Sequence, residues 1–233
     1  MTVNFEFLGV SASTTIVQDK HMNLVGGTIF YIDSSADGVY EFYDINGELI
    51  SNVAVGDKPY SYKIITPGSK DKYYILHDEL YDSLRWTYYK GSSYVYTSLG
   101  TGTAIGTGKS NTATVLAADD GAYITGDSKG YPTIWYKLQQ ARDTFIGGNN
   151  DWFMPSKEEM EKLRLAIKSG SITEGTIAGS SYEKSVFNSK ILWSSSEQSS
   201  SDTAWNWTSS RQMWGGYNCG KSYNYSVFFT RAF

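Results

Sequence analysis

The chain has 233 residues, of which 40% are hydrophobic and 15% aromatic, and a formal net charge of -4 at pH 7. This length fits one large domain or two small ones, and the apolar content is enough for a sizeable core. The acidic balance and the dispersed lysines and arginines provide no basic surface, which argues against nucleic acid as a partner. A single cysteine, Cys219, excludes an intrachain disulfide and a multi-cysteine metal site.

The sequence also bears on membrane contact. No apolar run approaches the roughly 18 residues that a membrane-spanning helix needs, and the N-terminus lacks the basic-then-apolar pattern of a signal peptide. We therefore expect no membrane insertion. The chain is either cytoplasmic or carried outside as part of a larger assembly, and these patterns do not decide between the two.

The first half of the chain reads mainly as strands. Residues 1–24, with a short apolar patch and then a polar run, are expected to be an N-terminal arm or attachment segment. Paired glycines followed by an apolar, β-branched and aromatic run predict a strand over Val25–Ile32. A hairpin is predicted over Val39–Ile50, because Asn46-Gly47 is the strongest short turn signal in the chain.

The middle of the chain is less regular. Asp57–Tyr96 is a tyrosine-rich strand region, with one short helix expected at Ile75–Leu84. The following glycine-rich stretch, TGTAIGTGKSN, resembles a phosphate-binding loop only superficially. Such a loop needs a glycine five residues before Gly108, and that position is Thr103. We therefore reject it as a phosphate site.

Two helices are predicted further along. Tyr131–Phe145 has helical periodicity, with an apolar face made of Trp135, Leu138, Ala141 and Phe145. Ser156–Ile167 carries the strongest local signal, because Ser156 and Glu159 can form a capping box and Gly170 follows as a stop. Its expected buried stripe consists of Met160, Leu163 and Ile167. Its acidic residues are interpreted as a capped, solvated helix face: Glu158, Glu159 and Glu161.

The tail from Trp193 to Phe233 has the composition of a recognition surface. It holds four of the seven tryptophans, with many serines, tyrosines, glycines and asparagines. Antibody paratopes use the same mixture, because Tyr and Trp give contact area at low entropic cost and Ser, Gly and Asn adapt their hydrogen bonds. Alternation in the middle of the tail predicts a strand with Trp205 and Trp207 inward. Its small residues should then face outward: Ala204, Asn206 and Thr208.

A set of motifs now appears in a fixed order. They are GGTIFYID (26–33), GTAIGTGKSNTA (102–113), DWFMPSKEEMEKL (151–163), LWSSSE (192–197), Ala204-Trp205 and the final Arg231-Ala232-Phe233. Together they resemble C-type-lectin-fold domains related to the formylglycine-generating enzyme and to Lcl-type collagen adhesins. More closely, they resemble the variable proteins of diversity-generating retroelements in phages and gut bacteria. The resemblance covers roughly residues 25–233.

The resemblance implies an α+β C-type lectin fold with two helices packed on small antiparallel sheets. It implies one domain over residues 25–233, with a tyrosine-rich insertion at about 40–97 and a variable ligand-binding region at about 193–233. In such systems a reverse transcriptase rewrites adenines, so that Asn codons diversify into Ser, Tyr, Gly, Thr, Asp, Cys, Arg and others. The composition of the tail agrees with that chemistry.

The codon chemistry sorts the tail into two groups. Changes at the two adenines of an Asn codon do not produce Trp, Gln, Met or Lys, so the expected scaffold is Trp205, Trp207, Gln212, Met213, Trp214 and Lys221. The candidate ligand contacts are Asn206, Thr208, Ser209, Ser210, Arg211, Gly215, Gly216, Tyr217, Asn218, Cys219, Ser222, Tyr223 and Asn224. For each of them an ordinary solvated loop residue is the alternative.

The sequence offers little for catalysis. A nucleophile made from Cys219 and His77 is conceivable, but the formylglycine-generating relatives need a second cysteine for copper, and His21 lies in the arm. We expect no enzyme and no cofactor, although scattered Asp and Asn oxygens leave calcium open.

The leading hypothesis is a display protein on a virion or cell surface, a phage receptor-binding component or a bacterial adhesin. Its tail would bind a protein or glycan receptor, and a homo-oligomer or attachment to a larger assembly is compatible with it. The alternative is a non-diversified carbohydrate- or collagen-binding adhesin domain of the same fold.

Overall fold

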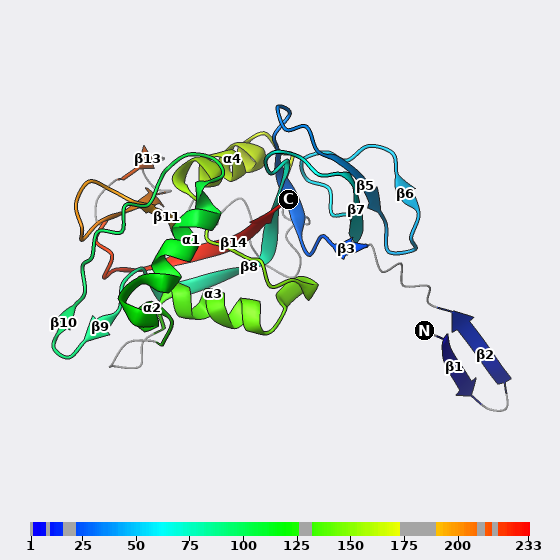
Figure 1. The fold of residues 1–233 in the computed structure, drawn as a ribbon, viewed down its shortest axis with the longest axis horizontal. Coiled ribbons are helices and arrows are strands. Elements are labelled where there is room, and N and C mark those ends of the chain that lie inside the picture. Colours follow the sequence, from blue (N-terminus) through cyan, green and yellow to red (C-terminus); the bar gives the residue numbers. More distant parts are fainter. Residues whose placement is uncertain are drawn as a thin grey trace.

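In the part of the chain that the structure describes, four α-helices pack on mostly antiparallel sheets, an α+β arrangement (Figure 1). The computed structural model describes residues 2–7, 10–15, 22–125, 132–172, 190–208, 213–215 and 219–233. The helices are α1 (Thr107–Ala117), α2 (Ala122–Thr125), α3 (Ile134–Asp143) and α4 (Lys157–Lys168), with 3-10 turns η1 (Ala118–Gly121) and η2 (Ile146–Gly148). The strands are β1 (Thr2–Phe7), β2 (Val10–Thr15), β3 (Asn23–Leu24), β4 (Thr28–Ile32), β5 (Val39–Tyr43), β6 (Leu49–Ile50), β7 (Ser61–Thr66), β8 (Tyr73–Arg85), β9 (Tyr89–Lys90), β10 (Ser93–Tyr94), β11 (Ile191–Glu197), β12 (Ala204–Thr208), β13 (Met213–Trp214) and β14 (Asn224–Ala232).

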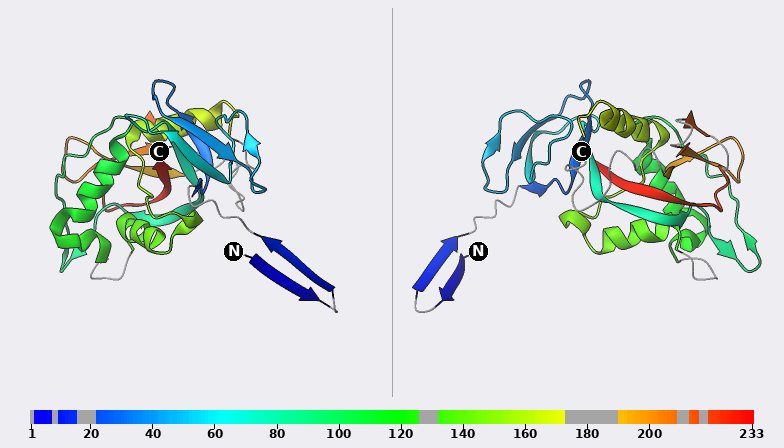
Figure 2. Two further views of the ribbon diagram at one scale, coloured as in Figure 1. Left: turned by 45° about the vertical axis from the view of Figure 1, so that its right-hand side comes forward. Right: turned by 180° about the vertical axis from the view of Figure 1, so that it is seen from behind.

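The larger sheet has the strand order β13-β12-β11-β14-β8-β4, and β14 pairs antiparallel with β8 along most of its length. Seen from behind, these two strands lie side by side across the body (Figure 2). Val227 and Phe229 of β14 share a buried cluster with residues of α3, whereas Phe228 shares the other cluster with Met160 and Leu163 of α4. Both faces of β14 are therefore covered, which accounts for the unbroken apolar run near the end of the chain.

The helix predicted over Ile75–Leu84 is wrong, because these residues belong to strand β8. Ile75 and Leu76 lie in different buried clusters, as neighbouring residues of a strand do. The apolar spacing of these residues fits a helix as well as a strand. Because β8 pairs with both β4 and β14, the residues adopt the extended conformation. Within the predicted tyrosine-rich insertion at about 40–97, β8 lies in the larger sheet, whereas β5, β6 and β7 lie in the smaller sheet.

The smaller sheet has the strand order β3-β7-β5-β6. The predicted hairpin over Val39–Ile50 is confirmed, since β5 and β6 pair antiparallel. Gly47 takes a positive φ of 81° in its turn, which favours glycine. The Asp44 carboxylate accepts hydrogen bonds from the amides of Asn46 (2.9 Å) and Glu48 (2.8 Å). The turn is therefore held by its own side chain as well as by the strands.

The C-terminal residues fasten the smaller sheet to the rest of the molecule. The Phe233 ring stacks on Tyr62 of β7, with 3.8 Å between centroids and 3° between planes. The Arg231 guanidinium donates to the carbonyl of Leu24 (2.5 Å) and pairs with Asp151 (2.9 Å). The two sheets therefore share one set of contacts at the end of β14.

The helix predicted within Tyr131–Phe145 is confirmed as α3. Its buried stripe contains Trp135, Leu138 and Ala141, as expected. Phe145 was expected on the same stripe, but it is 58% exposed and has a φ of 51°. The helix ends at Asp143, and the left-handed turn directs Phe145 away from the core.

The helix predicted over Ser156–Ile167 is confirmed as α4, with its buried stripe and both hydrogen bonds of the capping box. The prediction that Glu159 is solvated is wrong, because Glu159 is fully buried. Its Oε2 accepts from the Ser156 amide (2.7 Å), and its Oε1 accepts from the amides of Gly106 (2.8 Å) and Gly108 (3.5 Å) at the start of α1. Burial raises the pKa of Glu159, while these amides favour its charged form.

Glu159 also explains the glycine-rich stretch. Helix α1, which the sequence pattern did not predict, begins within it at Thr107. The first amides of a helix have no partners inside the helix and attract negative charge. At α1 the carboxylate of Glu159 supplies that charge, so an anion of the protein occupies the place that a phosphate takes in a phosphate-binding loop.

Strands β1 and β2 pair as a hairpin, in antiparallel register from Thr2 opposite Thr15 to Phe7 opposite Val10. Figure 1 shows this hairpin apart from the two sheets. The assignment of residues 1–24 to an attachment arm remains a prediction. Among the residues described, no helix is long and apolar enough to span a membrane.

We predict that Gly108→Ala destabilises the protein, although alanine is the better helix former. A Cβ at this position would lie 2.3 Å from Glu159 Oε2 and 2.8 Å from the Phe153 ring. Overpacking of this kind costs about 1–3 kcal/mol, which exceeds a propensity gain of about 1 kcal/mol. Urea unfolding measures the difference. As a control, Ser110→Ala at an exposed position of the same helix should stay within about 0.5 kcal/mol of wild type. A more stable Gly108→Ala would contradict the tight bridge between α1 and α4.

Candidate ligand-binding face

The tail begins in β11 and ends in β14, and these strands are neighbours in the larger sheet. β12 and β13 lie between them in sequence and are found at one end of the molecule, at the left of Figure 1. The candidate contact residues are therefore carried on a segment that core strands hold at both ends.

In β12 the predicted orientation is wrong, because Asn206 is fully buried and Thr208 is only 6% exposed. Asn206 lies opposite Trp193 of β11, and Trp207 lies opposite Leu192. Trp193 and Leu192 belong to different buried clusters. Both faces of β12 are therefore covered, and Asn206 and Thr208 do not reach the surface as ligand contacts.

The other candidate contacts fall into three groups. Outside the described residues lie Ser209, Ser210, Arg211, Gly216, Tyr217 and Asn218. Half-buried positions are held by Gly215, Cys219 and Ser222. At the surface are Tyr223, with 46% exposure, and Asn224. The structure thus brings Cys219, Ser222, Tyr223 and Asn224 together immediately before and at the start of β14.

Gly215 has a structural reason to be glycine. Its φ is 65°, and a Cβ there would lie 2.5 Å from the Trp205 ring. Exchange of Gly215 for a larger residue would displace that indole, which argues against a role as an exchangeable contact. The expected scaffold residues also divide, since Trp207 and Lys221 are buried while Trp205 and Trp214 are half-buried. Met213 is 45% exposed, and Gln212 lies outside the described residues.

A buried ion pair anchors the tail. The Lys221 ammonium lies 2.5 Å from Glu197 Oε1, donates to the Thr97 carbonyl (3.0 Å) and sits 4.4 Å from the Trp86 ring centroid. Glu197 Oε2 accepts from the amides of Leu99 (2.8 Å) and Thr101 (3.3 Å). The pair therefore joins the tail to the loop that leads into α1.

The main chain of Lys221 strengthens the same junction. Its carbonyl accepts from the amides of Trp86 (3.0 Å) and Thr87 (3.1 Å), and its amide donates to the Asp202 carbonyl (2.8 Å). Burial lowers the pKa of Lys221, and the hydrogen bond and charge of Glu197 oppose that shift. The sequence pattern assigned Lys221 to the scaffold but gave Glu197 no role. The available signal was that Lys221 is one of only four charged residues between Trp193 and Ser226, and that one of the others is a glutamate.

Helix α4 clamps the tail tryptophans. The Lys157 ammonium lies 4.1 Å from the Trp205 ring centroid, and the Arg164 guanidinium lies 5.0 Å from that of Trp207. Glu161 pairs with Arg164 (2.6 Å) and accepts from Trp214 Nε1 (2.9 Å). The Arg164 hydrogen bond, with help from Trp214, lowers the pKa of Glu161. Polar side chains of α4 therefore contact the indole rings of three tail tryptophans.

The three serines of LWSSSE are fully buried, so this part of the serine-rich tail is not a recognition surface. Ser194 Oγ donates to the Trp205 carbonyl (2.9 Å), and Ser196 Oγ donates to the Gly102 carbonyl (2.7 Å). Ser195 Oγ accepts from Asn111 Nδ2 (3.0 Å). These hydroxyls connect β11 to β12 and to the segment around α1.

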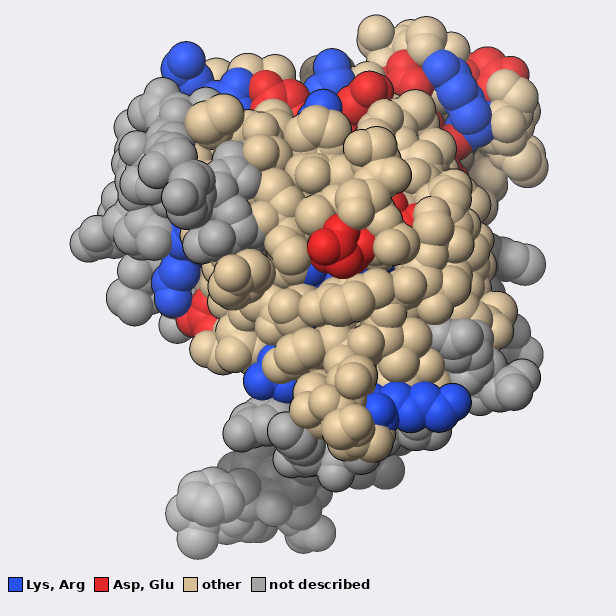
Figure 3. Space-filling model, turned by 90° about the vertical axis from the view of Figure 1, so that its left-hand side faces the viewer, with Lys and Arg blue, Asp and Glu red and all other residues tan. Residues whose placement is uncertain are grey.

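The described part of the surface at this end of the molecule carries few charged side chains. Figure 3 shows that most of its described area carries no Lys, Arg, Asp or Glu. The charged side chains gather mainly at the upper and lower edges, with one acidic group near the centre. Such a face has little attraction for a highly charged ligand.

The two residues considered for catalysis have other neighbours. His77 is buried on β8, edge to face with Trp152 at 4.9 Å, and its Nδ1 accepts from the Glu79 amide (3.1 Å). Cys219 Sγ lies 3.9 Å from Asn206 Oδ1. His21 lies outside the described residues. Among the residues described, no group of three or more His, Cys, Asp or Glu side chains could hold a metal ion.

A cavity of about 770 Å³ lies elsewhere, between the loops before β5 and β8, the start of α1 and the C-terminal Phe233. Its lysines are paired with carboxylates, Lys70 with Asp33 and Lys109 with Asp71, each at 2.8 Å. The Lys70 hydrogen bond, followed by those from Ser35, lowers the pKa of Asp33 to about 2. Of the tail, only Ala232 and Phe233 line the cavity, and none of the candidate contact residues does.

Comparisons with protein-family models, with curated proteins and with solved structures found no match.

We predict that Lys221→Met costs about 3–5 kcal/mol of unfolding free energy, because the Glu197 carboxylate would stay buried without its ammonium partner. Combining it with Glu197→Gln should recover much of that loss, since no buried charge remains. Urea unfolding at pH 7 measures both. Lys190→Met is the control, because it breaks an exposed pair with Asp82 and should cost less than about 1 kcal/mol. Similar small losses for Lys221→Met and Lys190→Met would show that the buried pair does not anchor the tail.

Proposed function

We propose that the protein is a ligand-binding display protein with a C-type lectin fold, and that the loops of its tail bind a protein or glycan receptor. The α+β architecture supports the proposal, as do the ordered motifs shared with variable proteins of diversity-generating retroelements. The proposed setting is a virion or a cell surface, where the protein acts as a receptor-binding component or an adhesin. The N-terminal arm would attach it to the larger assembly.

The observation that carries the proposal is the division of the tail into a buried frame and an exposed rim. The buried frame contains Trp193, Trp207 and Lys221. The exposed rim contains Tyr223 and Asn224, which directly follow Ser222 after Lys221. Tyrosine and asparagine are among the residues that rewriting of Asn codons yields, and tryptophan and lysine are not. Exchange at the rim would therefore leave the frame unchanged.

The chemistry of the rim fits a neutral receptor surface. Tyrosine supplies a large, rigid contact area with a polar tip, and asparagine and serine supply adaptable hydrogen bonds. The low charge of this end of the molecule (Figure 3) does not favour nucleic acid or a strongly acidic ligand.

A genomic observation separates diversification from its alternative. A diversified protein requires a neighbouring reverse transcriptase gene and a near-copy of the 3′ end of its own gene that differs from it at adenines. If neither is present, the alternative of an invariant adhesin domain replaces the diversified display protein.

We predict that replacing Ser222, Tyr223 and Asn224 together by alanine abolishes receptor binding and changes the unfolding free energy by less than about 1 kcal/mol. Trp207→Ala, the matched scaffold change, should cost about 3–5 kcal/mol because it empties a buried site. Binding is measured on a glycan microarray and by flow cytometry on a panel of bacterial cells, and stability by urea unfolding. Binding that survives the triple change, or a triple variant as unstable as Trp207→Ala, would contradict the proposal.

A further inference from the structure

A second group of tyrosines stands beside the tail, although it lies more than 100 residues earlier in the sequence. Strands β9 and β10 form a short hairpin in which the rings of Tyr89 and Tyr94 meet edge to face at 4.9 Å. The Tyr96 ring follows at 6.2 Å from Tyr94. Tyr96 is 41% exposed, close to the 46% of Tyr223 in the tail.

Two independent contacts hold this hairpin against the tail. The Arg85 guanidinium lies 5.4 Å from the Tyr94 ring centroid, and Arg85 is itself paired with Asn224 between β8 and β14. One residue after Tyr96, the Thr97 carbonyl accepts a hydrogen bond from the buried Lys221 ammonium. The tyrosines and the tail rim are therefore fixed relative to each other.

We propose that Tyr94 and Tyr96 form a fixed aromatic half of the ligand-binding face, beside the exchangeable half around Tyr223. This inference rests on the proposed function. Tyr89 has a different role, since its hydroxyl donates to the Ser92 carbonyl (2.7 Å) and holds the hairpin turn. A constant pair of tyrosines gives every version of the tail the same anchors, and tyrosine is enriched among the residues that dominate binding energy.

The ligand that fits this face is a folded protein with a neutral contact surface. Tyr96 and Tyr223 offer large, uncharged rings that are 41% and 46% exposed. Exposed aromatic side chains on an uncharged surface are typical of protein contact regions.

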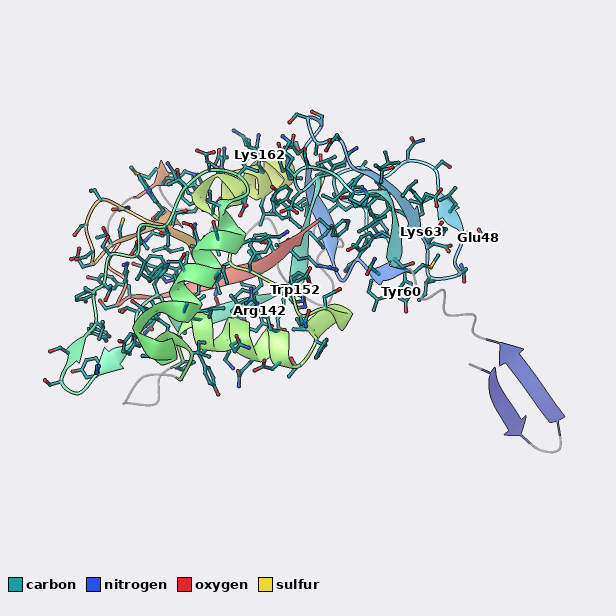
Figure 4. The ribbon with its side chains drawn as sticks, in the orientation of Figure 1. Glu48, Tyr60, Lys63, Arg142, Trp152 and Lys162 are labelled. Atoms are coloured by element: carbon teal, nitrogen blue, oxygen red, sulfur yellow. The ribbon has the colours of Figure 1, made fainter. Side chains whose placement is uncertain are left out.

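The test uses yeast-displayed libraries of the full chain, randomised at positions 209–211, 216–219 and 222–224. One library has the wild-type background, one carries Tyr94→Ser with Tyr96→Ser, and one carries Tyr60→Ser as matched control. Tyr60 is 50% exposed, directly precedes β7 of the smaller sheet, and lies at the opposite end of the molecule from β9, β10 and β13 (Figure 1 and Figure 4). Lysozyme is the protein probe and dextran the glycan probe.

We expect lysozyme binders of similar affinity from the wild-type and Tyr60→Ser libraries, and at least tenfold weaker ones from the double-serine library. Tenfold corresponds to about 1.4 kcal/mol, within the range of a single interface anchor. Equal affinities from all three libraries would overturn the inference and leave the proposed function standing. Binders to dextran alone would replace protein by glycan as the partner. If no library binds either probe, the proposed function itself fails.

Stability is checked separately, because Tyr94 is partly buried. The single change Tyr96→Ser, at the more exposed position, should leave urea unfolding within about 0.5 kcal/mol of wild type. Wild-type-derived lysozyme binders should still lose affinity when it is introduced. Retained affinity in a folded Tyr96→Ser variant would exclude Tyr96 from the face.

Discussion

The buried pair of Lys221 and Glu197 is the contact on which the geometry of the tail depends. Taking two charges out of water is costly, and attraction repays this only where hydrogen bonds satisfy the remaining atoms. Here the carbonyl of Thr97 and the amides of Leu99 and Thr101 do so. Apolar side chains of similar volume could fill the same space, but they would not fix the relative positions of the joined segments as narrowly. We infer that the pair serves specificity of arrangement more than stability.

The elements that the sequence predicted correctly are those whose signals are local. Ser156 and Glu159 stand three residues apart and cap one helix, and Asn46-Gly47 closes one hairpin. The failures involve partners far away in sequence. Glu159 also binds amides 51 and 53 residues upstream, and β8 owes its extended form to pairing with β14. Residue spacing within a short stretch of sequence reveals neither the amide partners of Glu159 nor the pairing of β8 with β14.

For the candidate site, the sequence predicts a region but not the direction of every side chain. The alternating residue types of β12 predict one buried and one solvent-exposed face. In β11, however, a buried residue lies opposite each of Asn206 and Trp207. Codon chemistry lists which residues rewriting can produce, and it has no information on burial. Asn206, Thr208 and Gly215 satisfy the codon rule and yet have packing roles. The set of residues that we propose to be exchangeable is therefore smaller than composition alone suggests.

The position of β14 after the tail has a consequence for errors. β14 lies between β11 and β8 and ends in the Arg231 and Phe233 contacts that fasten the smaller sheet. A frameshift or stop codon within the preceding loops would remove this strand, leaving β8 and β11 with unpaired edges and the core open. An intact C-terminus is therefore a condition for the fold itself, so any chain that presents the loops in this arrangement also carries a completed larger sheet.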